Sequence, residues 1–341
     1  MILVLLFCCR LGLSSLSGEN PKLDEKIEQL MLDFSVPGLQ LAVMKDDSVL
    51  YARSYGYADK ETGELVTDSS LFRIASISKP VTAITILKMA ESGKLDLNRT
   101  VFGQGGILSD DFEGIDFDEK VKGITVKHLL WHRSGWTNKP DDPMFWSGEL
   151  SRKQLISKIL ETRPPEHEPG TEAVYSNFGY CVLGRVIEKI TGMPYEQYVR
   201  DSILQMCGIT DMYIGGDQQE DRFPAEVTYY SMERTGAYDM AVRRMDSHGG
   251  WIASAKSLLK FLSKIDRNEG VTDFISPEML TDSYFNFFEW VHTGSLPGTT
   301  SIISRINDQY GFVVLANSRP RNQEELFERL RNIIKETYSC N

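Results

Sequence analysis

The chain has 341 residues, of which 41% are hydrophobic, enough to bury a large core as one domain or as two interleaved ones. Its formal net charge of −11 argues against nucleic acid and anionic membrane surfaces as partners, because both attract basic patches. Beyond residue 20, no apolar run approaches the ~20 residues that a membrane-spanning helix needs.

Residues 1–17 have the pattern of a secretory signal peptide. An apolar run at residues 2–9 is too short to cross a membrane, and small residues follow it up to Ser17. No basic residue precedes Arg10, so an uncleaved anchor or a misplaced start remains the alternative. The pattern predicts a secreted or extracytoplasmic protein, periplasmic if the source is bacterial.

The next segments predict a helix and a hairpin. Residues 24–34 have the apolar spacing of an amphipathic helix. Residues 40–44 and 49–55 are apolar and β-branched enough to form two strands around a polar turn.

A serine and a lysine three positions apart, Ser76 and Lys79, begin a helical pattern. On a helix this spacing brings the two side chains to one face, about one turn apart. Pro80 fits only the first turn, so Ser76 should lie at the helix N-terminus, where free N–H groups stabilise negative charge. The combination predicts a serine nucleophile with a proton acceptor beside it. Ser257 and Lys260 repeat the spacing, which we interpret as coincidence.

The middle of the chain, about residues 96–265, reads as helices and loops. Within it, Tyr175 and Asn177 place a phenol and an amide just before an apolar helix. A second Tyr-x-Asn occurs at Tyr284.

The last part of the chain returns to strands. Residues 290–292, 300–305 and 311–317 are rich in β-branched and apolar residues, and a helix is expected over 324–336. His292-Thr293-Gly294 lies between two apolar runs.

Strands at both ends of the chain and helices between them predict an α+β (α/β) fold. One antiparallel sheet would be assembled from the N- and C-terminal segments and flanked by helices, with an inserted, mostly helical region. We expect a single domain over 22–335. Its sheet part would cover about 22–95 and 266–335, and its helical part about 96–265.

The ordered motifs Ser-x-x-Lys, Tyr-x-Asn and His-Thr-Gly resemble those of the serine β-lactamase and penicillin-binding-protein superfamily. The similarity is greatest to the branch of class C β-lactamases, D-aminopeptidases, D,D-carboxypeptidases and related esterases, and it runs from about residue 22 to 335. Further blocks that agree are residues 36–39, 55–59, 125–135, 169–170, 249–251 and 294–298.

The resemblance implies roles for the motif residues. Ser76 would attack a carbonyl and form an acyl-enzyme, and either Lys79 or Tyr175 would take its proton. A cationic Lys79 nearby would favour the phenolate of Tyr175. Asn177 would hold the substrate amide, and His292, Thr293 and Ser295 would bind substrate along a strand edge. The backbone N–H groups of Ser76 and Ser295 would form the oxyanion hole.

His292 stands where β-lactamases of this superfamily usually have a lysine. A histidine is mostly neutral at pH 7 and binds a substrate carboxylate less firmly, although below about pH 6 imidazolium would supply the charge. This favours a small-molecule or peptide-like ester or amide substrate over a β-lactam. The stretch before His292 is shorter than in relatives, so a catalytically weak family member with a binding or self-assembly role is the alternative.

No metal or organic cofactor is expected. His128 and His132 are four residues apart but lack the intervening glutamate and third ligand of a zinc site, and His132 is interpreted as a structural hydrogen-bonding residue. After residue 17 only three cysteines remain, which allow one disulfide or none. The oligomeric state is left open.

Overall fold

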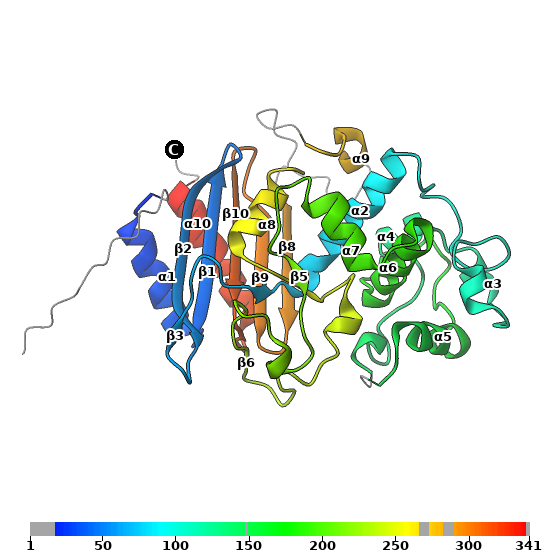
Figure 1. Cartoon of the computed structure of the whole chain (residues 1–341), viewed down its shortest axis with the longest axis horizontal. Coiled ribbons are helices and arrows are strands. Elements are labelled where there is room, and N and C mark those ends of the chain that lie inside the picture. The colour runs from blue at the N-terminus through cyan, green and yellow to red at the C-terminus, as the bar shows by residue number, and fades with distance from the viewer. Residues whose placement is uncertain (1–17, 147–148, 266–272, 282–289, 339–341) are drawn as a thin grey trace, which may run out of the picture.

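One antiparallel sheet, built by the two ends of the chain, organises the molecule (Figure 1). The computed structural model describes residues 18–146, 149–265, 273–281 and 290–338. Within these ranges the sheet has six strands in the order β3-β2-β1-β10-β9-β8. Its strands are β1 (Gly38–Lys45), β2 (Ser48–Asp59), β3 (Glu64–Leu65), β8 (Trp290–Leu296), β9 (Thr299–Arg305) and β10 (Tyr310–Ala316).

The pairing of β1 with β10 joins the two ends of the chain in the middle of the sheet. Leu39 lies opposite Ala316, and Lys45 opposite Tyr310. Successive side chains of β1 point to opposite faces, so alternate residues enter two different cores. Those of one set pack with helices α1 and α10, and those of the other set face α8 and the helical region. Both faces of the sheet are therefore covered.

Helix α1 (Pro21–Asp33) begins three residues before the predicted start at residue 24. Asn20 caps it by accepting a hydrogen bond from the Leu23 amide, and Pro21 fits the first turn because it needs no amide partner there. α10 (Gln323–Tyr338) covers the same face of the sheet and contacts α1. In Figure 1 the two helices, blue and red, lie together beside the strands.

The helical region lies beyond β8 and gathers at the right of Figure 1. Its central helices are α2 and α6, which pack against each other. Three short strands form a second small sheet in the order β4-β7-β5, and β6 pairs with β11. The helices outside the terminal pair are α2 (Ser78–Glu91), α3 (Glu119–Lys122), α4 (Val126–Leu130), α5 (Arg152–Thr162), α6 (Asn177–Thr191), α7 (Tyr195–Val199), α8 (Ala255–Leu262) and α9 (Pro277–Thr281). The short strands are β4 (Phe72–Arg73), β5 (Tyr213–Ile214), β6 (Tyr230–Ser231), β7 (Trp251–Ala253) and β11 (Ser318–Arg319).

The predicted fold class is confirmed: an antiparallel sheet from both ends of the chain, flanked by helices, with a largely helical insertion. The predicted division into a sheet part and a helical part stays a prediction. In the described part of the chain, β8 is the edge strand and pairs with β9. The segment 283–288 and the second Tyr-x-Asn lie outside the described residues.

Candidate active site

The nucleophile candidate lies in a single turn that leads into α2. Ala75–Ile77 form a short 3₁₀ turn, and α2 follows at Ser78, with Pro80 in its first turn as predicted. Lys79 Nζ is 3.1 Å from Ser76 Oγ. Nζ also donates a hydrogen bond of 2.8 Å to the backbone carbonyl of His248. Serine and lysine are thus brought together as their spacing indicates.

Complete burial changes the chemistry of Lys79. Its side chain is 0% exposed, and loss of hydration lowers its pKa to about 7, an effect that the carboxylate of Asp142 partly opposes. A lysine with this pKa is about half neutral at pH 7. Its nitrogen lone pair can then accept the proton of the Ser76 hydroxyl.

Tyr175 lies over the same lysine. Lys79 Nζ is 4.7 Å from the centre of the Tyr175 ring, and the phenol interacts with the Ser76 side chain. Burial raises the pKa of Tyr175 to about 12. The prediction that the lysine would favour the phenolate is therefore wrong, because desolvation and the negative charge of Asp142 raise the pKa of the phenol, and the hydrogen bond to Ser76 opposes them only in part. With these pKa values, Lys79 is better suited than Tyr175 to accept a proton, and the Tyr175 hydroxyl is suited to relaying one.

The ring of His132 packs against the ring of Tyr175. The two rings are in contact at a tilt of 31°, with centres 4.7 Å apart, and His132 Nδ1 accepts a hydrogen bond of 3.0 Å from the Ser176 amide. This agrees with the interpretation of His132 as a structural residue. Burial and the charge of Lys79 lower its pKa to about 3, so the ring is neutral at pH 7.

His292 faces the nucleophile turn rather than open solvent. Its Nε2 lies 2.8 Å from the Ser76 carbonyl oxygen; because that oxygen can only accept, Nε2 carries the hydrogen. Burial, and then the charge of Lys79, lower the pKa of His292 to about 3. The prediction that imidazolium forms below about pH 6 is wrong, because the enclosed ring is shielded from water and repelled by Lys79 when it is charged.

Gly294 explains why the third motif contains a glycine. A Cβ atom at this position would lie 2.3 Å from the Ile74 carbonyl oxygen and 2.2 Å from Ser301 Oγ. Ala75, directly before the nucleophile, adopts a left-handed φ of 46° and packs beside the same glycine. The missing side chain therefore lets the nucleophile turn lie directly against β8.

Thr293 and Ser295 lie on the opposite face of β8 from His292, as strand alternation requires. Thr293 is exposed. Ser295 Oγ donates to Gln323 and accepts from Arg319, so its side chain is engaged beside α10. The structure does not bring these two side chains to Ser76. Only the backbone of Ser295 is suited to the predicted oxyanion role.

Asn177 is held by a carboxylate that the sequence analysis missed. Asn177 Nδ2 donates a hydrogen bond of 2.5 Å to Asp142 Oδ2. Asp142 Oδ1 caps a short helical turn by accepting from the Met144 amide, at 2.9 Å. An Asp before Pro143 is a recognisable cap signal in the sequence, but its approach to the active site depends on packing across 35 residues.

A cavity of about 380 Å³ is lined by residues that follow Asp142 and β8 in the chain. Its walls come from the segment after Asp142, from the loop that follows β8 and from the region around residue 240. The apolar part of its lining consists of Met144, Phe145, Trp146, Met240, Met245 and Pro297. None of the residues Ser76, Lys79 and Tyr175 lines this cavity.

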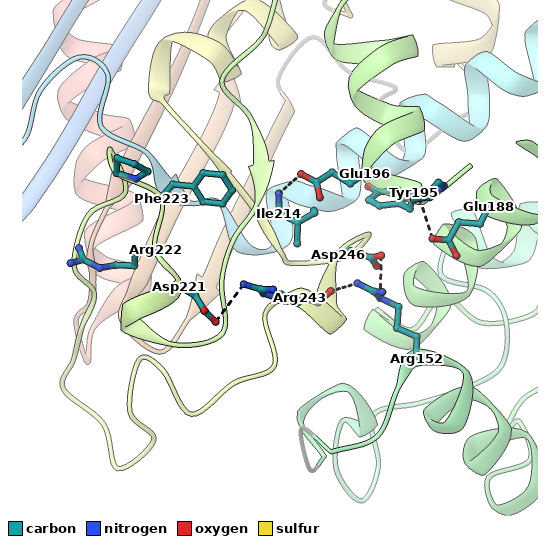
Figure 2. Close-up of a pocket in the computed structure, with 12 residues that line it drawn as sticks. Arg152, Glu188, Tyr195, Glu196, Ile214, Asp221, Arg222, Phe223, Arg243 and Asp246 are labelled. Carbon is teal, nitrogen blue, oxygen red and sulfur yellow. Dashed lines mark hydrogen bonds and ion pairs between the residues drawn. The ribbon is translucent and has the colours of Figure 1, made fainter. Parts of the chain in front are cut away.

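Figure 2 shows a second cavity, of about 600 Å³, whose lining comes from the helical region and from the loops around residues 221–224 and 243–246. Tyr195 lines this cavity, and its hydroxyl lies 2.6 Å from the Thr82 hydroxyl. Thr82 follows Lys79 by one turn of α2. Figure 2 shows Arg152 reaching Asp246 from the rim, at 3.1 Å, and Arg185 binds the same carboxylate at 2.7 Å. This buried ion cluster fixes the start of the segment whose His248 carbonyl receives Lys79.

No metal or reactive thiol is evident in the described part of the chain. It contains no group of three or more histidine, cysteine, aspartate or glutamate residues placed to hold a metal ion. Cys181 and Cys207 are free, and burial raises the pKa of both thiols. None of the helices in the described ranges is long and apolar enough to cross a membrane.

A profile of the Beta-lactamase family matches residues 23–334. Among curated proteins, a putative D-alanyl-D-alanine carboxypeptidase of Salmonella agona is 29% identical over 198 residues, which are 53% of this chain and 44% of that protein. Protein flp of Staphylococcus aureus is 28% identical over 93% of this chain and 67% of its own length. This chain therefore spans less than half of the carboxypeptidase and about two thirds of protein flp.

Solved structures show the same fold. The octameric penicillin-binding protein homologue of Pyrococcus abyssi has a TM-score of 0.74 at 24% identity, covering 94% of this chain and 78% of its own. The D-amino acid amidase of Ochrobactrum anthropi has a TM-score of 0.74 at 21% identity, covering 93% and 99%. A mutant class C β-lactamase has a TM-score of 0.71 at 20% identity, covering 93% and 96%.

Proposed function

Since this chain belongs to the beta-lactamase family of serine hydrolases, we propose that it hydrolyses an ester or amide through an acyl-enzyme on Ser76. One observation carries the proposal above the others. Lys79 Nζ lies 3.1 Å from Ser76 Oγ, and burial lowers the pKa of this lysine to about 7. A weak nucleophile therefore has a base beside it that is half unprotonated at pH 7.

In the first half of the reaction, Ser76 Oγ attacks the substrate carbonyl carbon while its proton passes to neutral Lys79. The backbone N–H groups of Ser76 and Ser295 stabilise the resulting oxyanion. When the tetrahedral intermediate collapses, the leaving group takes a proton from the lysine, by way of the Tyr175 hydroxyl, and departs. Lys79 is neutral again, and the acyl group remains on Ser76.

In the second half, water attacks the acyl-enzyme. Its proton passes to Lys79 and then to Ser76 Oγ as the ester bond breaks, which releases a carboxylic acid and regenerates the free serine. The His248 carbonyl holds Lys79 in place throughout, since it accepts a hydrogen bond from Nζ at 2.8 Å.

The environment of His292 favours substrates that need no carboxylate at this position. Its imidazole is enclosed and neutral, and its Nε2 hydrogen is used by the Ser76 carbonyl. It supplies no positive charge for the carboxylate of a β-lactam. We therefore place activated esters and peptide-like amides ahead of β-lactams as substrates.

A fluorophosphonate probe tests the proposal, because it reacts with activated serines. We expect a single labelled peptide containing Ser76 and no labelling of Ser76→Ala. Ser257→Ala is the matched control: Ser257 has a lysine at the same spacing, but its hydroxyl donates to Asp211 at 2.5 Å instead. Absence of labelling on folded protein would support the alternative of a non-catalytic family member.

Export of the protein is part of the proposal and rests on the sequence of residues 1–17. Expression of the full chain in a secreting host, followed by N-terminal sequencing of the extracellular protein, tests it. A mature N-terminus at residue 18 is expected. Retention of residues 1–17 on a cell-associated protein would favour the uncleaved anchor.

A further inference from the structure

Ser301, on β9, donates a hydrogen bond to the turn that carries the nucleophile. Its Oγ lies 2.8 Å from the Ile74 carbonyl oxygen, and its side chain is fully buried. In the pairing of β8 with β9, Ser301 lies opposite Gly294. A Cβ atom on that glycine would lie 2.2 Å from the hydroxyl, so Ser301 Oγ occupies the space that a side chain on β8 would fill. The sheet therefore holds the nucleophile turn with a side chain of β9 as well as with β8.

The turn that receives this bond contains a strained residue. Ala75 has a φ of 46°, in the left-handed region where Cβ crowds the following carbonyl oxygen. A residue other than glycine stays in this conformation only where the surrounding structure holds it there. The carbonyl group on each side of Ala75 is held: that of Ile74 by Ser301, and that of Ser76 by His292 Nε2, each at 2.8 Å. Two neighbouring strands thus fix the turn before and after its strained residue.

The need to pair buried polar groups does not explain the Ser301 bond. The Ile74 carbonyl also accepts a hydrogen bond of 3.1 Å from the Ile77 amide, which closes the short helical turn. A buried serine on β9 need not reach another segment either. Ser304, which is also buried, donates to the carbonyl oxygen of Arg305 in its own strand, at 3.2 Å. The Ser301 hydroxyl instead links the strand to the nucleophile turn.

The position of this turn determines the geometry of the proposed catalysis. Ser76 Oγ lies 3.1 Å from Lys79 Nζ, and the lysine is held separately by the His248 carbonyl. The N–H of Ser76, one of the two proposed oxyanion donors, belongs to the peptide that follows Ala75. If Ala75 relaxed to a negative φ, the hydroxyl and this N–H would move while the lysine stayed in place. A displacement of about 1 Å can lower the rate roughly a hundredfold.

We propose that Ser301 is a positioning residue of the active site, which together with His292 keeps Ala75 in its strained conformation and Ser76 within reach of Lys79. Ser301 acts through its bond to Ile74 and takes no part in the chemical steps. The inference rests on the proposed function, since it assigns a positioning role in that same reaction. It also gives β9 a part in the site that the three sequence motifs do not indicate.

The rate constant for fluorophosphonate labelling tests the inference, because it measures the reactivity of Ser76 directly. Ser301→Ala should lower this rate constant by about tenfold or more, and Ser304→Ala should leave it unchanged. The Ile74 carbonyl keeps its Ile77 partner in Ser301→Ala, so this variant should fold. Should it fail to fold, Ser301→Cys replaces it, since a thiol has a similar shape but is a weaker donor. The pH midpoint of labelling should stay at about 7, because Lys79 remains buried.

The strained residue supplies the decisive comparison. Glycine adopts a positive φ without steric cost, so a turn that carries Ala75→Gly needs less support. The loss caused by Ser301→Ala should therefore shrink to less than about threefold in an Ala75→Gly background. Equal losses in the two backgrounds, or an unchanged rate in Ser301→Ala, would overturn the inference. Failure of Ser76 to react in the wild-type protein would instead overturn the proposed function, so the two failures are distinguishable.

Discussion

Acidification from about pH 7.5 to about pH 5.5 should destabilise this protein through three buried histidines. His132, His248 and His292 are 7%, 3% and 6% exposed and lie around the catalytic lysine. Burial lowers the pKa of His132 and His292 to about 3 and that of His248 well below its ordinary value. The folded protein therefore keeps all three rings neutral across this range.

The magnitude follows from proton linkage. In the unfolded chain each ring titrates near pH 6.5, so below that pH the unfolded state binds more protons and stability falls as pH falls. Between about pH 7.5 and 5.5 each histidine contributes about one pH unit of difference, or about 1.4 kcal/mol. Three histidines give about 4 kcal/mol, a large share of the roughly 5–15 kcal/mol that is typical of a whole domain.

Urea unfolding followed by tryptophan fluorescence at several pH values measures this effect. His248→Asn should remove about 1.4 kcal/mol of the pH dependence, whatever it does to stability at pH 7.5, because one of the titrating groups is gone. His167→Gln replaces a histidine whose side chain is 31% exposed and serves as the control. A free energy of unfolding that stays constant between about pH 7.5 and 5.5 would refute the reasoning.

Three further outcomes are expected. kcat/KM for a neutral ester should rise with pH through about 7 as Lys79 loses its proton, with no separate inflection from His292. A rise only near pH 10 would show that the base does not have a lowered pKa. Gly294→Ala should lower kcat/KM by roughly a hundredfold, because the added methyl group would push the nucleophile turn off β8, whereas Gly123→Ala, with 3.5 Å to its nearest neighbour, should not. Asp246→Asn should shift the midpoint of this pH profile, because the ion cluster positions the His248 carbonyl that holds Lys79. Loss of activity with an unchanged midpoint would indicate general destabilisation instead.

The sequence predicted well the features that depend on residues close together in the chain. Ser76 and Lys79 lie one helical turn apart, so their spacing alone indicated that they would meet, and Pro80 indicated where the helix begins. Period-two and helical patterns likewise predicted the strands and the terminal helices to within a few residues. Asn20 before Pro21 is a cap signal, and it explains why α1 begins three residues before its predicted start.

What the sequence could not predict depends on burial and on long-range contacts. Tyr175 is 41% exposed as a whole residue, yet partial enclosure of its hydroxyl raises its pKa, and no local pattern reports how enclosed one end of a side chain is. Asp142 enters the site by packing against α6, 35 residues further along the chain. The ring of His292 binds a backbone oxygen 216 residues away, so its neutral state could not be read from the motif.

The contact between His292 and the nucleophile turn also determines when activity can appear during folding. The two partners are separated by 216 residues, and Lys79 is separated from its carbonyl partner by 169. Contacts this distant in sequence form slowly, because a long loop must close before they are made. Until they form, Lys79 remains hydrated and protonated and cannot activate Ser76. Partly folded chains are therefore expected to be inert, and recovery of fluorophosphonate labelling should follow the slowest refolding phase.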